Sequence, residues 1–423
     1  MIRDDRKARL TSSANPPAVV VGLDNITGLQ TARILNARGV TVVGVASDLR
    51  HFGSRTNSCV QVIESPMSGD PLIRTLRALA ARLERKAVLV PCTDEAVWTL
   101  SRRRDELTAS FHLPLGRHDV VDMLMDKGRF AEHAYATGLP IPRTVVLTNR
   151  DDAEAAAQSM RFPAVLKPAT KSASWLQHTR AKALPVAGPS ELLTCYDQVV
   201  DWSEVLLVQE WVNGGEERLY SCNAYFDADG QALVTFVARK LRQWPPKVGT
   251  SASGEECRND EVLAQTLRTF GSVGFHGLAY LELKQDAATG RMQIIEPNVG
   301  RPTGRSAIAE RGGVELVYTA YCDAAGLPIT NTQQQYGGAK WLDVRRDLQA
   351  AFVGFRRGQL SVRDWAASLR GPKAHAIWSA RDPLPFAVDL VHATAGGQRI
   401  LRNRLRTARR AAKIPTHHKA SAR

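Results

Sequence analysis

A hairpin with two facing acidic residues is the feature that most restricts how this chain can fold. Segment 277–301 reads GLAYLELKQDAATGRMQIIEPNVGR, with a turn-forming DAATG stretch between two apolar strands. If the register is symmetric about Thr289, Glu282 lies directly opposite Glu296. Asn298 then lies on the same face, because side chains alternate along a strand. The pattern predicts three oxygen ligands that converge on one face of the hairpin.

The facing carboxylates repel each other, so they need either full solvation or a cation between them. Two solvent-facing glutamates on an amphipathic hairpin are one interpretation. The other is a metal site, and Mg²⁺ suits it because that ion takes a few protein carboxylates and completes its octahedron with phosphate oxygens and water. Mn²⁺ is the alternative ion. The metal ligands predicted by the second interpretation are Glu282, Glu296 and Asn298.

Two lysines elsewhere in the chain are placed where they could meet phosphate charge. Lys167 ends the apolar run PAVLKP, so its ammonium group would project from a buried strand. Lys127, in MDKGRF, begins a helix whose amide groups and dipole favour anions. A solvated surface position is the alternative for either lysine alone, and their occurrence together favours a triphosphate site.

The segment LLVQEWVNGGEERLY is an apolar strand that runs into a Gly-Gly loop and two acids. The backbone groups of Glu210 and Val212 would be exposed at this strand-to-loop hinge and could read the edge of adenine. Either Glu216 or Glu217 could accept hydrogen bonds from ribose hydroxyls, and the sequence does not separate the two.

The order of strand and helix patterns predicts several domains, because 423 residues exceed what one compact core usually organises. Residues 18–48 read as strand, Gly-containing turn, helix and strand, which is a βαβ unit. Mostly antiparallel strand patterns follow the helical stretch 118–137. The apolar residues of the region after these strands could form two helices. The expected units are an α/β domain at 16–120, an α+β domain at 121–330, a helical extension at 331–395 and a basic tail at 396–423.

The first Gly-containing turn, GLDNITG, offers an alternative function. Gly22, Gly28 and Asp48 half resemble a dinucleotide-binding fingerprint, which would make the protein an NAD(P)-dependent oxidoreductase. Asp24 replaces the middle glycine of that fingerprint and would repel a pyrophosphate. A structural α/β domain that offers loops to a small substrate is therefore favoured.

Composition and charge restrict the compartment and the partners. The six cysteines are scattered without close pairs, which fits a reducing compartment, and no apolar stretch approaches the roughly 20 residues of a membrane span. No secretory signal pattern is visible at the start, so a cytoplasmic protein is expected. The net charge is +14, but nine Lys and Arg lie between Arg399 and the C-terminus. That tail is expected to be solvated, with a membrane-associated nucleotide-binding protein as the alternative, and no nucleic-acid partner is expected.

Taken in order, Lys127, PAVLKP, VQEWVNGGEE, LELK and EPN resemble the ATP-grasp superfamily. Residues 16–385 resemble its carboxylate-amine ligase branch, which includes proteins like carbamoyl-phosphate synthase and D-alanine ligase. The resemblance implies an N-terminal Rossmann-like pre-ATP-grasp domain at 16–120 and an ATP-grasp domain at 121–330. In the latter, a lid subdomain at about 140–208 and a metal-binding subdomain at about 209–330 would hold ATP between them.

The resemblance also implies a role for each motif residue. Phosphates would be bound by Lys127 and Lys167, adenine by the backbones of Glu210 and Val212, ribose by Glu216 or Glu217, and magnesium by Glu282, Glu296 and Asn298. Many family members place an arginine two residues after the asparagine, where this chain has Gly300. The catalytic cations are therefore expected among Arg301, Arg305 and Lys240, with Arg242 as a further candidate.

The activity implied is an ATP-dependent ligation. A carboxylate would attack the γ-phosphorus of ATP, and an amine would then displace phosphate from the acyl phosphate to leave an amide, ADP and phosphate. The resemblance associates this chain with cell-surface polysaccharide or secondary metabolism. Small-molecule carboxylate and amine substrates are expected, together with an oligomeric state and, as an alternative role for the tail, peripheral membrane contact.

Overall fold

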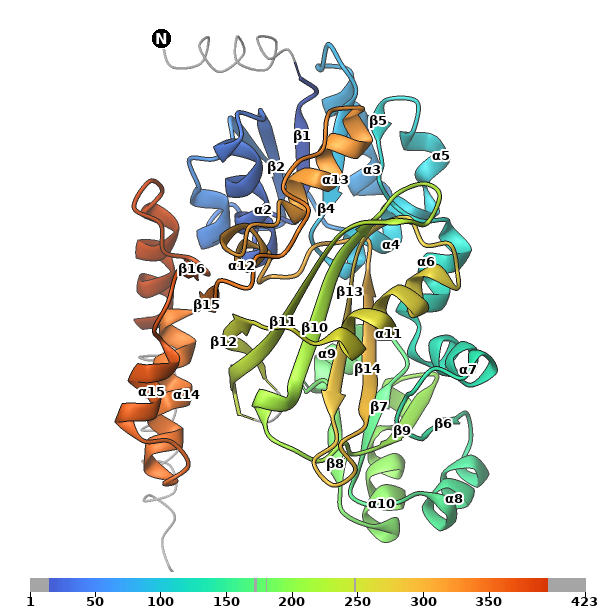
Figure 1. The fold of residues 1–423 in the computed structure, drawn as a ribbon. Helices are drawn as coiled ribbons and strands as arrows, with labels where there is room; N and C mark the ends of the chain where they lie inside the picture. Colours follow the sequence, from blue (N-terminus) through green and yellow to red (C-terminus); the bar gives the residue numbers. More distant parts are fainter. Residues whose placement is uncertain (1–14, 171–172, 180, 247–248, 395–423) are drawn as a thin grey trace, which may run out of the picture.

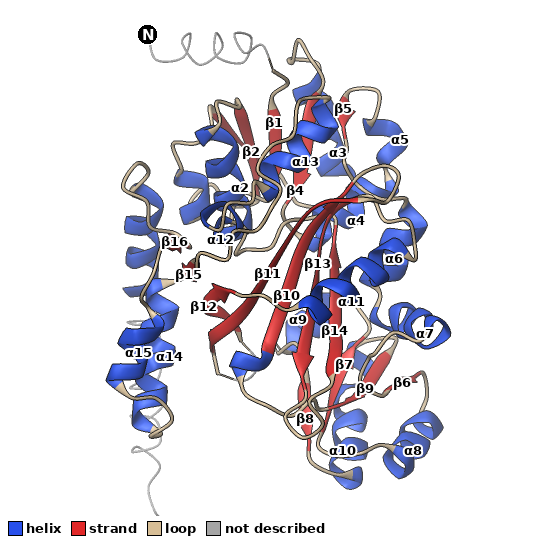
Figure 2. Cartoon of the chain, viewed as in Figure 1, coloured by secondary structure: helices blue, strands red, loops and turns tan. Residues whose placement is uncertain are grey.

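Three β-sheets follow one another along the chain in the computed structural model, which describes residues 15–170, 173–179, 181–246 and 249–394. Figure 1 shows the first sheet at the top, the longest strands crossing the middle and a smaller sheet below them. Helices cover the outer faces, as Figure 2 shows. The predicted mixture of α/β and α+β architecture is confirmed.

The first sheet is parallel and has the strand order β3-β2-β1-β4-β5. Its strands are β1 Ala18–Val21, β2 Val42–Ala46, β3 Gln61–Glu64, β4 Ala87–Pro91 and β5 Phe111–His112. The accompanying helices are α2 Ile26–Ala37, α3 Gly69–Ala80, α4 Asp94–Arg102 and α5 Arg104–Leu107, with the short helix η1 at Phe52–Arg55. Strands β1, β2 and β4 are fully buried because helices cover both faces of the sheet.

The helical stretch predicted at 118–137 is two helices, α6 His118–Met125 and α7 Lys127–Thr137. Asp126 separates them because its extended backbone ends α6, and its side chain accepts hydrogen bonds from the amides of Gly128 and Arg129 at the start of α7. Gly138 ends α7 in the left-handed conformation. Lys127 is therefore the first residue of a well-capped helix, as predicted.

The second sheet is antiparallel, with the order β6-β9-β7-β8. It contains β6 Thr144–Leu147, β7 Ala164–Pro168, β8 Leu184–Val186 and β9 Leu206–Glu210. Its helices are α8 Arg150–Ser159, α9 Ala173–His178, α10 Pro189–Val199 and the short η2 Val200–Trp202. The lid subdomain implied at about 140–208 includes residues 171, 172 and 180, which lie outside the described residues.

The third sheet has seven strands in the order β14-β13-β10-β11-β12-β15-β16. Its strands are β10 Leu219–Phe226, β11 Ala232–Trp244, β12 Thr250–Glu256, β13 Gly277–Gln285, β14 Met292–Val299, β15 Lys340–Leu342 and β16 Lys373–His375. The helices in this part are η3 Glu216–Arg218, α11 Asp260–Gly271, α12 Ala307–Arg311 and α13 Leu316–Ala325. Helix α13 packs on the first sheet, so the N-terminal and central parts share one continuous core.

The C-terminal extension contains α14 Val344–Arg356, α15 Val362–Ser368 and a helical segment at 384–394. The expectation of helices alone was incomplete, because β15 and β16 add two strands to the edge of the third sheet. A buried carboxylate anchors α14: Asp347 is 1% exposed and accepts hydrogen bonds from Arg242 Nε at 2.6 Å, Ser253 Oγ at 2.6 Å and Trp365 Nε1 at 2.8 Å. The tail at 396–423 lies outside the described residues.

We expect Asp347→Ala to lower the free energy of unfolding by about 3 to 5 kcal/mol, because it leaves the Arg242 guanidinium buried without its carboxylate. Urea denaturation followed by circular dichroism would measure the change. Gln349→Ala, on the exposed side of the same helix, is the matched control and should change stability little. Equal stability of the two variants would contradict the anchoring role of Asp347.

In the described ranges, none of the helices combines the length and the apolar character required to cross a bilayer.

Candidate functional site

The two predicted acidic ligands face each other at the centre of the hairpin formed by β13 and β14. Glu282 pairs with Glu296, and Tyr280 pairs with Asn298. The pairing depends on a β-bulge. On the turn side of the bulge Leu283 pairs with Ile294, which is one residue away from the predicted register. One extra residue on β14 then brings Glu282 and Glu296 into the predicted pairing. Both carboxylates are half-buried, which leaves them neither fully solvated nor sealed in the core.

Two buried cations lie near these carboxylates, one on β11 and the other on the loop after β14. Lys240 Nζ is 3.5 Å from Glu282 Oε2, and burial lowers the pKa of Lys240 despite the nearby carboxylate. Arg305 is 6% exposed, and its Nη2 donates to Ser221 Oγ at 2.9 Å. Arg305 Nη1 is buried and has no hydrogen-bond partner in the described part of the chain. Such an unsatisfied cationic donor is costly unless it meets an anion, so it fits a substrate-facing role.

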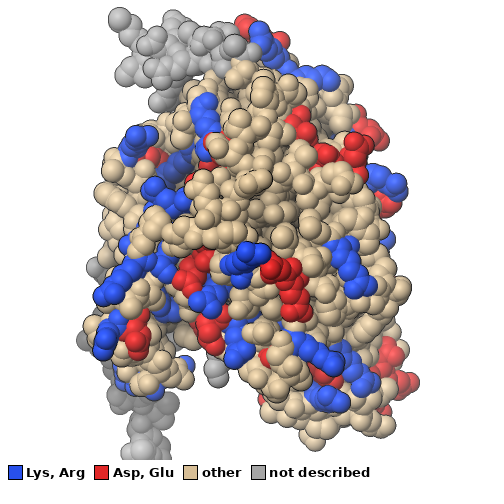
Figure 3. Space-filling model, viewed as in Figure 1, with Lys and Arg blue, Asp and Glu red and all other residues tan. Residues whose placement is uncertain are grey.

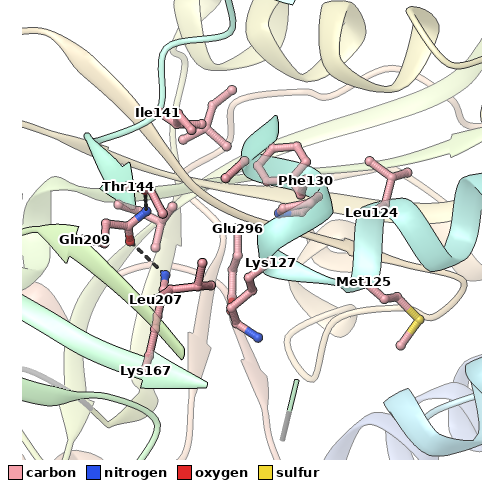
Figure 4. Close-up of a pocket in the computed structure, with 14 residues that line it drawn as sticks. Leu124, Met125, Lys127, Phe130, Ile141, Thr144, Lys167, Leu207, Gln209 and Glu296 are labelled. Carbon is pink, nitrogen blue, oxygen red and sulfur yellow. Dashed lines mark hydrogen bonds between the residues drawn. The ribbon is translucent and has the colours of Figure 1, made fainter. Parts of the chain in front are cut away.

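The two predicted lysines line one pocket together with Glu296 (Figure 4). Lys167 is 9% exposed, and its Nζ donates to Gln209 Oε1 at 2.8 Å. Gln209 Nε2 in turn donates to Thr144 Oγ1 at 2.8 Å, which fixes the amide. Burial, with a smaller contribution from Lys127, lowers the pKa of Lys167 to about 8, while Glu296 acts in the opposite direction.

The rest of the pocket is mainly apolar. Its walls come from α6, α7, the second sheet and β14, and they include Leu124, Phe130, Ile141, Leu207 and Ile294. Apolar walls beside a few polar groups are the usual composition of a small-molecule site. A planar base with attached phosphates matches this division between apolar and charged surfaces.

The hinge after β9 leaves specific backbone groups for a ligand. The N–H of Glu210 donates to the carbonyl of Arg143 at 2.9 Å, and its side chain accepts from the N–H of Arg161 at 3.2 Å. The carbonyl oxygen is therefore the group that Glu210 can offer. Val212 makes no backbone hydrogen bond among the described residues, so its N–H remains as a donor. A carbonyl and an N–H two residues apart match the acceptor and donor edge of adenine.

The two candidate ribose ligands differ in what they contact. Glu216 is half-buried, and its Oε2 accepts a hydrogen bond from the N–H of Gln243 at 2.7 Å. Glu217 is exposed in η3, just before β10, and lies close to the buried Lys284. The geometry favours Glu217 as the ribose ligand and a structural role for Glu216.

We expect Glu217→Ala to raise the KM for ATP by at least about tenfold, because a hydrogen bond to a charged group contributes about 1.5 to 3 kcal/mol. Steady-state kinetics with varied ATP would measure this. Glu204→Ala, an exposed glutamate before β9, is the control. A normal KM for Glu217→Ala, with a raised KM for a folded Glu216→Ala, would exchange the roles of the two glutamates.

Gly300 explains why the arginine expected two residues after Asn298 is absent. Its φ is +75°, and a Cβ there would lie 2.6 Å from side-chain carbons of Leu115 and Val97. No side chain fits without displacing these core residues. Arg301 follows and turns back, so that its Nη2 donates to Asn298 Oδ1 at 3.0 Å.

Arg301 also connects the site to the N-terminal part of the chain. It forms an ion pair with Asp94 at the start of α4, and its Nη1 donates to Tyr280 Oη at 2.9 Å. These contacts raise the pKa of Arg301 despite its burial, so the guanidinium stays charged. Of the predicted catalytic cations, Arg301 is thus already paired, whereas Arg305 keeps a free donor nitrogen within the described structure. Arg242 pairs with Asp347 through Nε and with Ser368 through Nη1, and its Nη2 is also buried without a hydrogen-bond partner among the described residues.

Three polar residues of the site were not predicted. Gln209 orients Lys167, Ser221 holds Arg305, and Lys284 lies with its Nζ 5.1 Å from the centre of the Trp211 ring. Lys284 could have been found, because it lies two residues after Glu282 and so shares its face of β13. The other two contacts join distant segments and left no local signal.

The donor set fits a magnesium ion better than a transition metal. Two carboxylates and an amide oxygen are hard ligands, and they leave coordination positions for phosphate and water. Among the described residues, no group of three or more His, Cys, Asp and Glu is arranged to hold a metal. Glu282, Glu296 and Asn298 would be the protein ligands of a magnesium ion that binds together with the nucleotide.

The alternative dinucleotide site is not supported by the first sheet. Asp24 lies at the carboxyl ends of β1 and β2, where its Oδ2 accepts hydrogen bonds from the N–H groups of Ser47 at 2.8 Å and Asp48 at 3.1 Å. Its negative charge occupies the position where a pyrophosphate would have to bind. Gly28 instead permits close packing, since a Cβ there would lie 2.2 Å from the carbonyl oxygen of Gly22.

Solved structures with a similar fold include a nucleotide-bound enzyme. The biotin carboxylase domain of 2-oxoglutarate carboxylase from Hydrogenobacter thermophilus, in complex with MgADP and bicarbonate, aligns with a TM-score of 0.60 and 14% identity, over 76% of this chain and 72% of that chain. N5-carboxyaminoimidazole synthetase from Staphylococcus aureus aligns with a TM-score of 0.60 and 12% identity, over 76% and 80%. The chain has the ATP-grasp fold.

Sequence relatives of the chain are ligases by name. D-Aspartate ligase of Enterococcus faecium (strain Aus0004) is 22% identical over 57% of the chain and 59% of its own length. D-Alanine--D-alanine ligase of Ectopseudomonas mendocina (strain ymp) is 28% identical over 42% of the chain and 55% of its own length. The chain thus spans little more than half the length of these relatives. No model of a known protein family matches it.

Proposed function

We propose that the chain is an ATP-dependent carboxylate-amine ligase of the amide-forming class, which uses Mg-ATP and releases ADP and phosphate. The observation that carries the proposal is the placement of Lys127, Lys167 and Glu296 around one pocket, with Glu282 facing Glu296. Two cations and two opposed carboxylates from four separate strands and helices match the charge pattern of a metal-bound triphosphate. The ligase names of the relatives agree with this chemistry.

In the proposed reaction, an oxygen of the substrate carboxylate attacks the γ-phosphorus of ATP, and the bond to the bridging oxygen of ADP breaks. An amine nitrogen then attacks the acyl carbon of the acyl phosphate. Phosphate leaves, and the nitrogen loses a proton to give the amide. Magnesium would supply neutralisation of phosphate charge, and Mn²⁺ is an alternative ion. The chain itself contributes positioning and fixed positive charge.

Each residue of the site has a place in this scheme. Lys127 and Lys167 would hold phosphate oxygens, and the backbones of Glu210 and Val212 would bind adenine. Arg305, with its free Nη1, is best placed to meet the substrate carboxylate or the transferred phosphoryl group. Arg301 and Lys240 would hold Asn298 and Glu282 in position, because each already contacts one of these residues.

The names of the relatives suggest a chemical class for the substrates. Both relatives are named for amino acids, so amino acids are the first candidates for the carboxylate and the amine. A role in cell-surface polysaccharide or secondary metabolism, a cytoplasmic location and an oligomeric state are parts of the same proposal. The structural relative from Hydrogenobacter thermophilus is described as a dimer, which supports testing for an oligomer.

A phosphate-release screen tests the proposal. Purified protein with Mg-ATP would be assayed against single amino acids and sugar acids, and against pairs of each acid with an amine. Release that requires both a carboxylate and an amine, and that stops when EDTA removes the metal, is the expected result. Absence of ATP binding by calorimetry, together with binding of NADH, would overturn the proposal in favour of an oxidoreductase.

A further inference from the structure

Large apolar side chains that are exposed to solvent concentrate on the C-terminal extension. Seven of the twelve such residues in the described structure lie between residues 344 and 394, and they are Leu348, Phe352, Val362, Trp378, Leu384, Leu390 and Val391. The other five are distributed over the remaining described chain. An exposed apolar patch of this kind usually marks an interaction surface.

One ion pair connects α14 with the helical segment 384–394, and each element has exposed apolar residues. Leu348 is 51% exposed and Phe352 is 60% exposed, and both lie on the face of α14 that begins with Arg345. Arg345 Nε and Nη2 each donate to a carboxylate oxygen of Asp389 at 3.1 Å. The residues that follow Asp389 are 43% and 63% exposed. We call Leu348, Phe352, Leu390 and Val391 the C-terminal patch.

The residues of the C-terminal patch are not part of the buried face that holds α14 on the third sheet. The opposite face of α14 contains the buried Asp347, Ala350 and Ala351, which pack toward β11 and β12. The segment before 384 is fixed to helix α2, since Arg33 Nε donates to Asp382 Oδ2 at 2.9 Å. The two elements that contain the C-terminal patch are therefore each attached to the rest of the protein. Figure 1 shows α14 and α15 along one side of the molecule.

The exposed charges of the C-terminal extension are mostly positive. Between residues 344 and 394 the exposed charged side chains include five arginines, at positions 356, 357, 363, 370 and 381. Three of the four acids in this range, Asp347, Asp382 and Asp389, are buried and paired with arginines, which leaves Asp364 exposed. The sequence that follows, 395–423, has nine Lys and Arg and no acid. Basic side chains, with a few acidic ones among them, lie along the left margin of the view in Figure 3.

We infer that the C-terminal patch docks the protein on an anionic lipid bilayer surface. Aliphatic and aromatic side chains among arginines suit such an interface, where apolar groups enter the acyl boundary and cations meet lipid phosphates. The phosphates of a nucleic acid could bind the cations, but Leu348, Leu390 and Val391 would stay exposed to water. A second copy of the chain would bring the same arginines against themselves across a symmetric contact. The bilayer is the partner that complements both properties.

Vesicle sedimentation of the full chain tests the inference. We expect binding to phosphatidylcholine vesicles that contain about 30 mol% phosphatidylglycerol and little binding to phosphatidylcholine alone. Raising NaCl from about 0.1 M to about 0.5 M should weaken it, because salt screens the cations. Equal binding to both vesicle types, or no binding to either, would overturn the inference.

Substitutions separate the patch from the basic tail. The double variant Leu390→Glu/Val391→Glu is expected to bind anionic vesicles at least about tenfold less well, as is Phe352→Glu on the other helix. Leu267→Glu, an exposed leucine on α11 that is 39% exposed, is the matched control. Phosphate release in solution should stay unchanged in all three, so the outcome is independent of the proposed ligase activity. Wild-type binding by both folded patch variants, or a dimer in ultracentrifugation that they dissociate, would contradict the inference.

Discussion

Replacement of Glu296 by glutamine is expected to reduce Mg-ATP-dependent phosphate release by at least about a hundredfold, the scale of losing one key electrostatic group. Glu296 faces Glu282 and borders the pocket that also contains Lys167. Glutamine keeps the shape and one acceptor oxygen but removes the charge that would hold a divalent ion. Because Lys240 already neutralises part of the charge of Glu282, the remaining carboxylate alone would bind the ion weakly.

Phosphate release with varied Mg²⁺ is the measurement, and the variant should need more metal as well as turn over more slowly. Glu84→Gln, at an exposed position after α3, is the control. The repulsion between facing carboxylates also predicts that Glu296→Gln is at least as stable as the wild type without metal. Unchanged turnover of a folded Glu296→Gln protein would remove Glu296 from the site.

The facing glutamates could be predicted from the sequence because they depend on strand alternation and on one turn. The register is nevertheless reached by a route that the sequence did not reveal. The strand pairs next to the turn are one residue away from the predicted register. The bulge on β14, opposite Glu282 and Leu283, corrects this difference. A bulge has no strong sequence signature here, so the prediction succeeded because strand symmetry was assumed about Thr289 rather than derived.

Contacts between distant segments limited the prediction of the cations. Gly300 is visible in the sequence, but its packing against Leu115 and Val97 is a tertiary property. The partner of Arg301 is Asp94, more than two hundred positions earlier in the chain. The sequence could therefore name Arg301 and Arg305 as candidates and could not separate them, because burial and pairing decide which guanidinium has a free donor.

Edge strands and boundaries were predicted less well than central elements. The buried strands β1, β2 and β4 are continuous apolar runs and were found, whereas β3 and β15 are short and only partly buried. β15 and β16 form because β12 offers a free edge, and pairing with that edge stabilises segments that have little strand pattern of their own. Tertiary context therefore decided the secondary structure of the C-terminal extension.

Substitution of Lys167 by alanine is expected to lower kcat/KM for ATP by at least about a hundredfold and to change its dependence on pH. The pKa of Lys167 is lowered to about 8, so in the wild type the free enzyme loses this positive charge as the pH rises through that value. A neutral amine cannot offset phosphate charge, and kcat/KM, which reports the free enzyme, should decline above about pH 8. Lys167→Ala should lack that decline, whereas Lys86→Ala, at an exposed lysine, should keep it. The same decline in the Lys167→Ala variant would assign the titration to another group and would end the case for Lys167 as the phosphate-binding cation.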